Sequence, residues 1–394
     1  AFSERHQREP HLIKLNKQTM RIGIEAQRIF REKKHGMDMV ALALIKNLQQ
    51  LDTENEYFIF VNDSEDPSAI KETKNFKIVP LTPAPYPIWE QKHLAKAVKT
   101  YQLDMLHCTS NTAPVSCSVP LLITLHDIIY LEKINLKEGT WYQRLGNIYR
   151  RWNVPKVVKK AAMIFTVSQY EQKRIVQHFK MNDEAVDVVY NGVANHFKVE
   201  DLEKQEVIRK KYKLPKSFIL FLGNTDPKKN LKGVLKSLAI LEKNKVNYPD
   251  IVMPDFGKEV LVNMLNEIKA PLLLSKIHLT GYIPNEDLPA IYSQAKVFLY
   301  PSLRESFGLP ILEAMACGCP VLTADTSSMP EVAGDAAIIV DPFDPSAISA
   351  GIEKILVDNS LREELISKGF KRPPLFDYKK GALDTLSAYQ KIHA

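Results

Sequence analysis

Short strand-like segments alternate with amphipathic helical segments along almost the whole chain, and this alternation is the strongest constraint on its fold. Seven runs rich in β-branched and aromatic residues are expected as strands in the first half: RIGIEA, EYFIFV, FKIVPL, MLHC, PLLITLHD, AMIFTVS and VDVVY. Helical stretches such as MDMVALALIKNLQQL, with apolar residues every three or four positions, lie between several of them. Ser168 and Glu171 form a capping box that predicts a helix start after AMIFTVS. Such alternation predicts a parallel sheet with helices on both faces.

The second half repeats the pattern with SFILFLG, DIVMP, IHLTGY, KVFLYPS, PVLTAD and AAIIVD, again separated by helical stretches such as PILEAMAC. Between the halves, NGVANHFKVED at 191–201 combines an Asn-Gly turn with charged residues and is expected to be a hinge. The sequence therefore predicts two doubly wound, Rossmann-like α/β domains at 20–192 and 193–375. An amphipathic helix is expected within 376–394.

The totals limit the class of protein. With 394 residues, 45% of them apolar, the chain is long enough for two or three domains with their own cores. No apolar run approaches the roughly 20 residues that span a bilayer, and residues 1–19 are polar, so we expect a flexible leader or tag remnant there rather than a signal peptide. Four cysteines without zinc-binding spacing favour buried, reduced thiols and a cytoplasmic location: Cys108, Cys117, Cys317 and Cys319.

The net charge of +7 is concentrated in one stretch of the first half. Residues 144–180 carry nine basic residues and a single acid, Glu171, and aromatic residues are interleaved with them. Two interpretations stay open, a surface for an anionic membrane or acidic acceptor, and a solvated helix face. Nucleic acid is disfavoured because no binding motif accompanies the charge. The candidate patch comprises Arg150, Arg151, Trp152, Lys156, Lys159 and Lys160.

The segment PSLRESFGLPILEAMACGCPVLT holds the most specific functional signal. A strand precedes it, and Pro310 is well suited to the first turn of a helix. Backbone N–H groups from 307 to 311, except that of Pro310, are then expected to be unpaired and to form an anion site. Glu305 lies in the loop before this helix, and Glu313 lies about one turn inside it. Carboxylates on both sides of an anion site match a nucleotide sugar, with its ribose diol, diphosphate and hexose.

Several common ligand motifs are absent. Neither half has GxGxxG after its first strand, and no GxxxxGK[ST] occurs, which disfavours dinucleotide-dependent enzymes and P-loop nucleotidases. There is no DxD motif, because Asp335 and Asp341 are too far apart to form one, and we expect no metal site.

The stretch ESFGLPILE resembles the E-x7-E signature of retaining GT-B glycosyltransferases of family 4. Further blocks resemble the family in the same order over nearly all of residues 20–394: RIGIEAQRIF with Gly36 downstream, His126-Asp127, FTVSQYE, VVYNGV, GNTDPKKN, HLTGYIPNEDLPAIYSQA and SSMPEVAGDAA. The N-terminal segments look most like the mannosyltransferase members. The resemblance implies the GT-B fold, two Rossmann-like domains that face each other across a cleft.

The resemblance also implies roles in the second domain. Glu313 is expected to accept hydrogen bonds from the ribose hydroxyls, and Glu305 to face the donor hexose. Lys229 is expected to neutralise the diphosphate, helped by Lys228 because Asn224 stands where many relatives have arginine. The implied donor-binding residues are Gly36, Gly223, Asn224, Lys228, Lys229, Tyr282, Ile283, Glu305, Ser306, Phe307, Gly308, Leu309 and Glu313. For Tyr282 and Ile283, expected at the base, a buried strand end is the structural alternative.

In the first domain, the resemblance places His126 against the donor sugar. Asp127 is expected to orient this histidine or the acceptor hydroxyl, and the helix starting at Gly36 to approach the donor phosphates or the acceptor. A structural histidine at a strand end is the alternative for His126. With Glu305 and Lys229, these two residues make up the implied catalytic set.

The implied reaction moves a hexose, mannose being favoured, from a GDP- or UDP-linked donor to a hydroxyl of a glycan or lipid-linked glycan, with retained configuration. Lys229 and the helix dipole are expected to replace a metal, and the leaving phosphate oxygen to take the acceptor proton. Peripheral contact with the inner face of the cell membrane is a further expectation. The alternatives are a glycoside hydrolase, a nucleotide-sugar epimerase of the same fold and a non-catalytic nucleotide-sugar-binding subunit.

Overall fold

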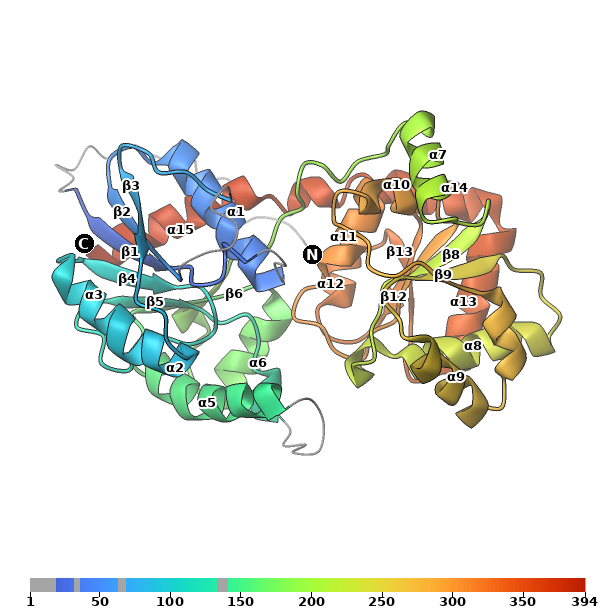
Figure 1. Ribbon diagram of the computed structural model, residues 1–394, viewed down its shortest axis with the longest axis horizontal. Coiled ribbons are helices and arrows are strands. Elements are labelled where there is room, and N and C mark those ends of the chain that lie inside the picture. Colours follow the sequence, from blue (N-terminus) through green and yellow to red (C-terminus); the bar gives the residue numbers. More distant parts are fainter. Residues whose placement is uncertain (1–18, 32–35, 63–68, 133–140, 394) are drawn as a thin grey trace.

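The structure is a computed structural model that describes residues 19–31, 36–62, 69–132 and 141–393. The leader expected at 1–19 lies almost entirely outside the described residues. Figure 1 shows two α/β units side by side, joined by the chain that leads to α7 and by the returning C-terminal segment.

The first unit is built on a sheet of seven parallel strands in the order β3-β2-β1-β4-β5-β6-β7. Their bounds are β1 (Arg21–Glu25), β2 (Glu56–Val61), β3 (Phe76–Pro80), β4 (Met105–Cys108), β5 (Leu121–Thr124), β6 (Met163–Thr166) and β7 (Val186–Val188). The register pairs Ile24 of β1 with Ile59 of β2 and His107 of β4. The strand order reverses direction between β1 and β4, and ligands of such sheets bind at the carboxyl ends of the strands at such a point.

Helices cover both faces of this sheet. They are α1 (Gly36–Leu51), α2 (Tyr86–Ile88), η1 (Trp89–Leu94), α3 (Ala95–Thr100), α4 (Ile129–Glu132), α5 (Trp141–Val158), α6 (Gln169–Phe179) and η2 (Asp183–Ala185). Ser168 caps α6, since its hydroxyl accepts a hydrogen bond from the N–H of Glu171 at 3.2 Å. This half of the expected capping box is confirmed.

The second unit contains six parallel strands in the order β10-β9-β8-β11-β12-β13. They are β8 (Phe218–Phe221), β9 (Asp250–Met253), β10 (Ile277–Leu279), β11 (Val297–Tyr300), β12 (Val321–Ala324) and β13 (Ala337–Val340). Its helices are α7 (Leu202–Lys211), η3 (Pro227–Lys229), α8 (Leu231–Lys243), α9 (Lys258–Glu267), η4 (Pro271–Lys276), α10 (Leu288–Tyr292), α11 (Leu309–Ala316), α12 (Met329–Ala333), α13 (Pro345–Val357), α14 (Asn359–Gly369) and η5 (Pro373–Leu375). The predicted fold class, two parallel doubly wound domains, is confirmed.

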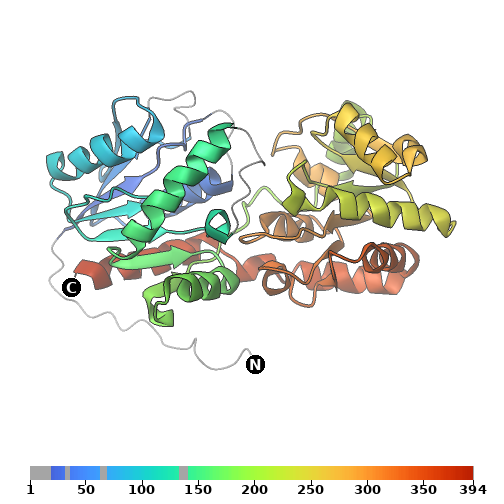
Figure 2. The same ribbon diagram turned by 90° about the horizontal axis from the view of Figure 1, so that it is seen from below.

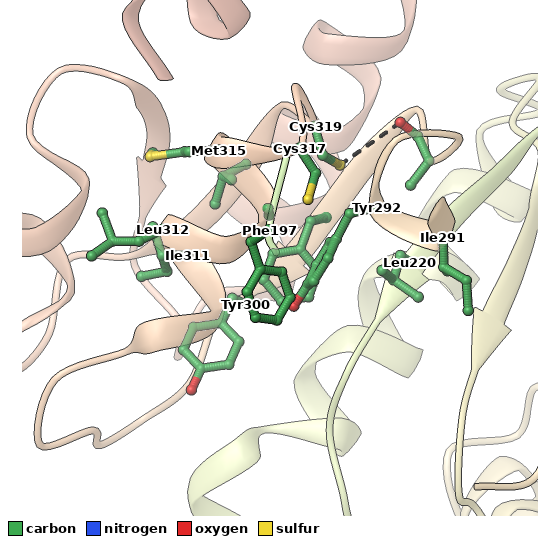
Figure 3. Close-up of a cluster of buried hydrophobic side chains, with 14 of the residues drawn as sticks. Phe197, Leu220, Ile291, Tyr292, Tyr300, Ile311, Leu312, Met315, Cys317 and Cys319 are labelled. Atoms are coloured by element: carbon green, nitrogen blue, oxygen red, sulfur yellow. Dashed lines mark hydrogen bonds between the residues drawn. The ribbon is translucent and has the colours of Figure 1, made fainter. Parts of the chain in front are cut away.

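Each sheet has a hydrophobic cluster on each face, which explains why many of its strands carry apolar residues at successive positions rather than only at alternate ones. Strands β8, β11 and β12 are buried throughout. Figure 3 shows part of the cluster beneath α11, including Tyr292 and Tyr300. Cys317 and Cys319 belong to it, and the Cys319 thiol donates to the carbonyl of Ala295 at 3.7 Å. All four cysteines are free thiols.

The last helix, α15 (Tyr378–His393), packs on the first unit although the segment before it belongs to the second. Figure 2 shows it beneath the sheet of the first unit. The Tyr389 hydroxyl lies 2.8 Å from Nδ1 of His107, whose pKa burial lowers to about 3, so this buried imidazole is neutral. Gly192 permits the crossing, because a Cβ there would lie 2.4 Å from the backbone N of Tyr378.

Candidate active site

The loop between β11 and α11, residues 301–308, is called the donor loop below. Gly308 is the N-cap of α11 with φ +103°, a backbone conformation that favours glycine, and Pro310 follows in the first turn. Within the described residues, the N–H groups of Phe307, Gly308 and Leu309 have no protein hydrogen-bond partner. The N–H of Ile311 donates to the carbonyl of Gly308 at 3.0 Å, so the prediction that it is unpaired is wrong. Three N–H groups therefore remain to bind an anion at this helix start.

The donor loop carries an ion pair with the loop that follows β8. Nζ of Lys229 lies 2.7 Å from Oε1 of Glu305 and donates to the Tyr300 hydroxyl at 3.1 Å. The side chains of the pair are only 18% and 12% exposed. Solvent therefore screens this pair weakly, and Glu305 lies two residues before the first of the three N–H groups.

Glu313 lies on α11, one turn inside the helix, with Tyr292 as its hydrogen-bond donor at 3.4 Å. Burial raises its pKa to about 7, only partly offset by that long hydrogen bond. Tyr292 and Tyr300 both come from the cluster in Figure 3; the hydroxyl of Tyr292 meets Glu313, and that of Tyr300 meets Lys229, the ion-pair partner of Glu305. The carboxylate of Glu313 has room for further hydrogen-bond donors, because each carboxylate can accept several.

The loop after β8 holds three more of the expected residues. A Cβ at Gly223 would lie 2.4 Å from the ring of Phe221, so only glycine fits the close path of the chain. Oδ1 of Asn224 accepts from the N–H of Asp226 at 2.9 Å, which makes this side chain part of a turn. Lys228 lies 3.6 Å from Asp226 and is 40% exposed. The side chain of Lys229 thus reaches the donor loop, whereas Lys228 contacts it through its backbone carbonyl, which accepts from the N–H of Leu303 at 2.7 Å.

On the first domain, His126 is buried after β5. Its Nε2 lies 2.9 Å from the carbonyl oxygen of Thr109, and its backbone N–H donates to Oδ1 of Asn111 at 2.6 Å. A carbonyl can only accept, so Nε2 carries the proton and Nδ1 is left as an acceptor. Burial lowers the pKa of the ring, which keeps it neutral.

Asp127 contacts the second domain. Its Oδ2 accepts a hydrogen bond from the hydroxyl of Ser306 at 2.9 Å, and its Oδ1 accepts from the N–H of Ile129 at 3.1 Å. Since Asp127 follows β5 and Ser306 follows β11, this bond brings the carboxyl ends of the two sheets face to face. Asp127 was expected to orient the histidine or the acceptor, and its observed partners are the donor loop and its own turn.

Several contacts between the domains were not identified from the sequence. Nη1 of Arg304 lies 2.5 Å from Oε1 of Glu171, which the capping box had explained as a purely local residue. The carboxylate of Glu331 on α12 accepts from the N–H groups of Gln169 at 2.9 Å and Tyr170 at 3.2 Å. The sequence pointed to these residues only through their positions. Arg304 directly precedes Glu305, and Glu331 lies in SSMPEVAGDAA, one of the blocks that resemble the family.

Other expected residues lie apart from this constellation. Gly36 begins α1 with open space around it. The side chain of Tyr282 is 57% exposed. Ile283 is buried in the second-domain core, which is the structural role given above as the alternative to contact with the base.

The basic patch lies on α5 and on the two residues after it, next to exposed apolar side chains of the same helix. Leu145, Ile148 and Trp152 are 54%, 55% and 45% exposed. Lys156 and Lys159 are exposed beside them, and Nζ of Lys156 lies 4.0 Å from the centre of the Trp152 ring. Of the remaining patch residues, Arg150 and Arg151 are half-buried, and Lys160 is exposed with its Nζ bonded to the carbonyl of Val115 at 2.9 Å.

Two kinds of feature are absent from the described ranges. None of their helices combines the length and apolar character that a bilayer crossing requires. Their His, Cys, Asp and Glu side chains form no group of three that could hold a metal ion.

Two Rossmann-like domains whose sheets meet at their carboxyl ends define the GT-B fold. Residues 35–196 match the family model described as Glycosyltransferase Family 4, and residues 204–372 match the one described as Glycosyl transferases group 1. The chain belongs to glycosyltransferase family 4.

Among its relatives, the chain is 32% identical over 246 residues to O-antigen chain mannosyltransferase B of Escherichia coli, covering 62% of this chain and 64% of the relative. It is 29% identical over 238 residues to the serotype-specific mannosyltransferase WbdA of Escherichia coli, covering 59% of this chain but 29% of the relative. The chain thus spans less than two thirds of these relatives. The structure of Anabaena HepE in complex with UDP and glucose shares the fold, with a TM-score of 0.71 and 17% identity over 94% of this chain and all of that one.

Proposed function

We propose that the protein transfers mannose from a nucleoside-diphosphate donor to a hydroxyl of a glycan or lipid-linked glycan in the synthesis of a surface polysaccharide. The observation that carries the proposal is the donor loop, where the Lys229–Glu305 pair is followed by three N–H groups at the start of α11 that have no protein partner among the described residues. A diphosphate needs this combination of a cation and backbone donors. The mannosyltransferase names of the relatives and the UDP bound to HepE support the choice of donor.

In the proposed reaction, the diphosphate attracts Lys229, which leaves Glu305 free to accept hydrogen bonds from the hexose hydroxyls. Glu313 accepts from the ribose hydroxyls at the other end of the donor. The acceptor hydroxyl attacks the anomeric carbon on the side of the leaving group, as the carbon–oxygen bond to the diphosphate breaks. Attack from that side retains the configuration. The acceptor proton passes to the leaving phosphate oxygen, so no protein base is needed, and Lys229 takes the place of a metal.

Neutral His126 has a defined part in this scheme. With its proton directed to Thr109, the ring presents only the acceptor Nδ1 for further hydrogen bonds. Nδ1 would accept from a hydroxyl of the transferred hexose and fix its orientation. Position and electrostatics then supply the rate enhancement, without a covalent intermediate.

The experiment that tests the proposal measures thermal stabilisation by a panel of nucleoside diphosphates and their sugars, followed by transfer assays with the best donor. GDP-mannose is expected to stabilise most, with UDP-hexoses next. Glu313→Ala is expected to abolish the shift produced by any nucleotide with a ribose diol. A protein that no nucleotide stabilises would contradict the proposal, and turnover of the donor to an epimer without acceptor would replace it by an epimerase.

We further propose that α5 places the first domain on the inner face of an anionic membrane. Its exposed apolar side chains, Leu145, Ile148 and Trp152, can insert into the interface of a bilayer. The exposed positive charges of Lys156 and Lys159 would attract anionic lipid headgroups. Sedimentation with vesicles containing phosphatidylglycerol tests this. Leu145→Ser with Ile148→Ser is expected to reduce binding even at low salt, whereas binding that neither this pair nor Lys156→Glu with Lys159→Glu affects would overturn it.

A further inference from the structure

The first domain holds the donor loop on both sides of Glu305. On one side, the guanidinium of Arg304 pairs with Glu171, as described above. On the other side, the Ser306 hydroxyl donates to Asp127, and the Ser168 hydroxyl donates to the carbonyl oxygen of Ser306 at 2.9 Å. The residue proposed to recognise the donor hexose thus lies between two attachments to the opposite domain.

Arg304 links the first domain to the backbone of Glu305 itself. The same Nη1 that binds Glu171 also donates to the carbonyl oxygen of Glu305 at 3.0 Å. The guanidinium lies over the ring of Tyr170, with 4.8 Å from its carbon to the ring centre. Its side chain is 14% exposed and that of Glu171 is fully buried. An ion pair this buried contributes little net stability, because desolvation offsets its attraction, but it fixes a geometry.

A second contact joins the same region of the first domain without touching the donor loop. Glu331, on α12, accepts from the N–H groups of the first turn of α6 and from the Tyr190 hydroxyl at 2.8 Å. Its carboxylate thus acts as an N-terminal cap supplied by the other domain. This contact provides a natural control, since it depends on the same approach of the domains as the Arg304–Glu171 pair.

We propose that Arg304 and Ser306 are positioning residues that make the alignment of Glu305 depend on contact with the first domain. When the domains close, Glu171, Asp127 and Ser168 fix the donor loop, and the carboxylate of Glu305 is then held where it meets the hexose. The diphosphate is bound by groups of the second domain alone, Lys229 and the start of α11. Donor binding and donor alignment are therefore separate functions of the same loop. This inference rests on the proposed function.

The test compares Arg304→Gln with Glu331→Gln, each of which removes one charged contact between the domains. Because Arg304 belongs to the donor loop and donates to the carbonyl of Glu305, whereas Glu331 lies on α12, Arg304→Gln is expected to lower kcat about tenfold or more while nucleoside-diphosphate affinity changes less than about twofold. Glu331→Gln is expected to have a clearly smaller effect on kcat. Equal losses of kcat in the two variants, or a loss of nucleotide affinity in Arg304→Gln that matches its loss of kcat, would reduce Arg304 to a general interface residue and overturn the inference.

A double-mutant cycle distinguishes the loss of one shared contact from independent folding defects. Glu171→Gln is expected to reproduce the kcat loss of Arg304→Gln, and the double variant to be little worse than either single one, because both disrupt one contact. Additive losses would contradict this. If the wild-type protein transfers no sugar, the proposed function fails; if it does and Arg304→Gln is as active, only the present inference fails.

Discussion

The two domains share one architecture but treat their buried carboxyl groups differently. Burial raises the pKa of Glu90 in the first domain and of Glu313 in the second to about 7. Glu90 accepts hydrogen bonds from Thr112 at 2.6 Å, from Tyr86 at 2.9 Å and from Tyr149. Glu313 has Tyr292 as donor at 3.4 Å. A carboxyl group whose hydrogen bonds are complete holds the fold together, whereas one with remaining capacity can bind a ligand.

The same contrast extends to the rest of the site. In the second domain, the ion pair of Lys229 and Glu305 and the N–H groups of α11 supply charge and dipole. In the first domain, the buried rings of His107 and His126 are kept neutral, because burial lowers the pKa of both. We infer that the donor side works by electrostatics and the acceptor side by shape and neutral hydrogen bonds. Three predictions test this division.

The largest effect is expected for Lys229→Met, which removes the cation of the donor side and leaves Glu305 unneutralised. Loss of one preorganised electrostatic contact lowers kcat by about 100- to 1,000-fold, and nucleoside-diphosphate affinity is expected to fall as well. Steady-state kinetics and calorimetric titration with the nucleotide measure both. Lys228→Met is the matched control, since its side chain faces Asp226, and equal losses in the two variants would contradict the assignment to Lys229.

The second prediction concerns the first domain. Glu90→Ala leaves three hydroxyl groups of different elements without their shared acceptor, and it is expected to cost about 3 kcal/mol of stability. Nucleotide affinity is expected to be unchanged, because the groups proposed above to bind the diphosphate, Lys229 and the start of α11, lie in the second domain. Denaturant unfolding and nucleotide titration of the same variant check both statements. A variant that stays stable but binds nucleotide poorly would break the comparison between the two carboxyl groups.

Much of this division follows from the sequence, because elements and helix starts are encoded locally. All thirteen predicted strands are present, since strands buried on both faces produce apolar runs that stand out. The start of α11 is also encoded locally, because Pro310 suits the first turn of a helix and Gly308 suits the residue before it.

Contacts between residues that are far apart in the chain could not be predicted from the sequence. Glu171 and Arg304 are 133 positions apart, and the local pattern explained Glu171 completely as a capping residue. Likewise, the bond between Asp127 and Ser306 depends on the approach of two domains, which no spacing encodes. The wrong prediction for Ile311 has a local cause. Its N–H group, which a regular helix start leaves unpaired, donates to the carbonyl of Gly308 three residues earlier.

The smallest expected effect is a pH dependence of donor binding that arises from Glu313 in the second domain and not from Glu90 in the first. Near pH 7 the carboxyl group of Glu313 is about half protonated in the free protein. Hydrogen bonds from a ribose diol favour the charged form, so binding releases a proton and nucleotide affinity is expected to rise a few-fold from about pH 6 to 8. Titration calorimetry in buffers of different ionisation enthalpy measures affinity and proton release together.

Glu313→Gln is expected to abolish this dependence, because the amide does not titrate, whereas Glu90→Gln should leave it intact. Stability responds in the opposite sense. A folded pKa raised above the ordinary 4.5 means that Glu313 stabilises the unliganded protein fully below pH 4.5 and that this contribution is lost as pH rises through about 7. Rising pH should thus weaken the unliganded fold while it strengthens nucleotide binding. A pH dependence of binding that vanished in Glu90→Gln instead would place the titrating group in the first domain, and the division between the domains would be wrong.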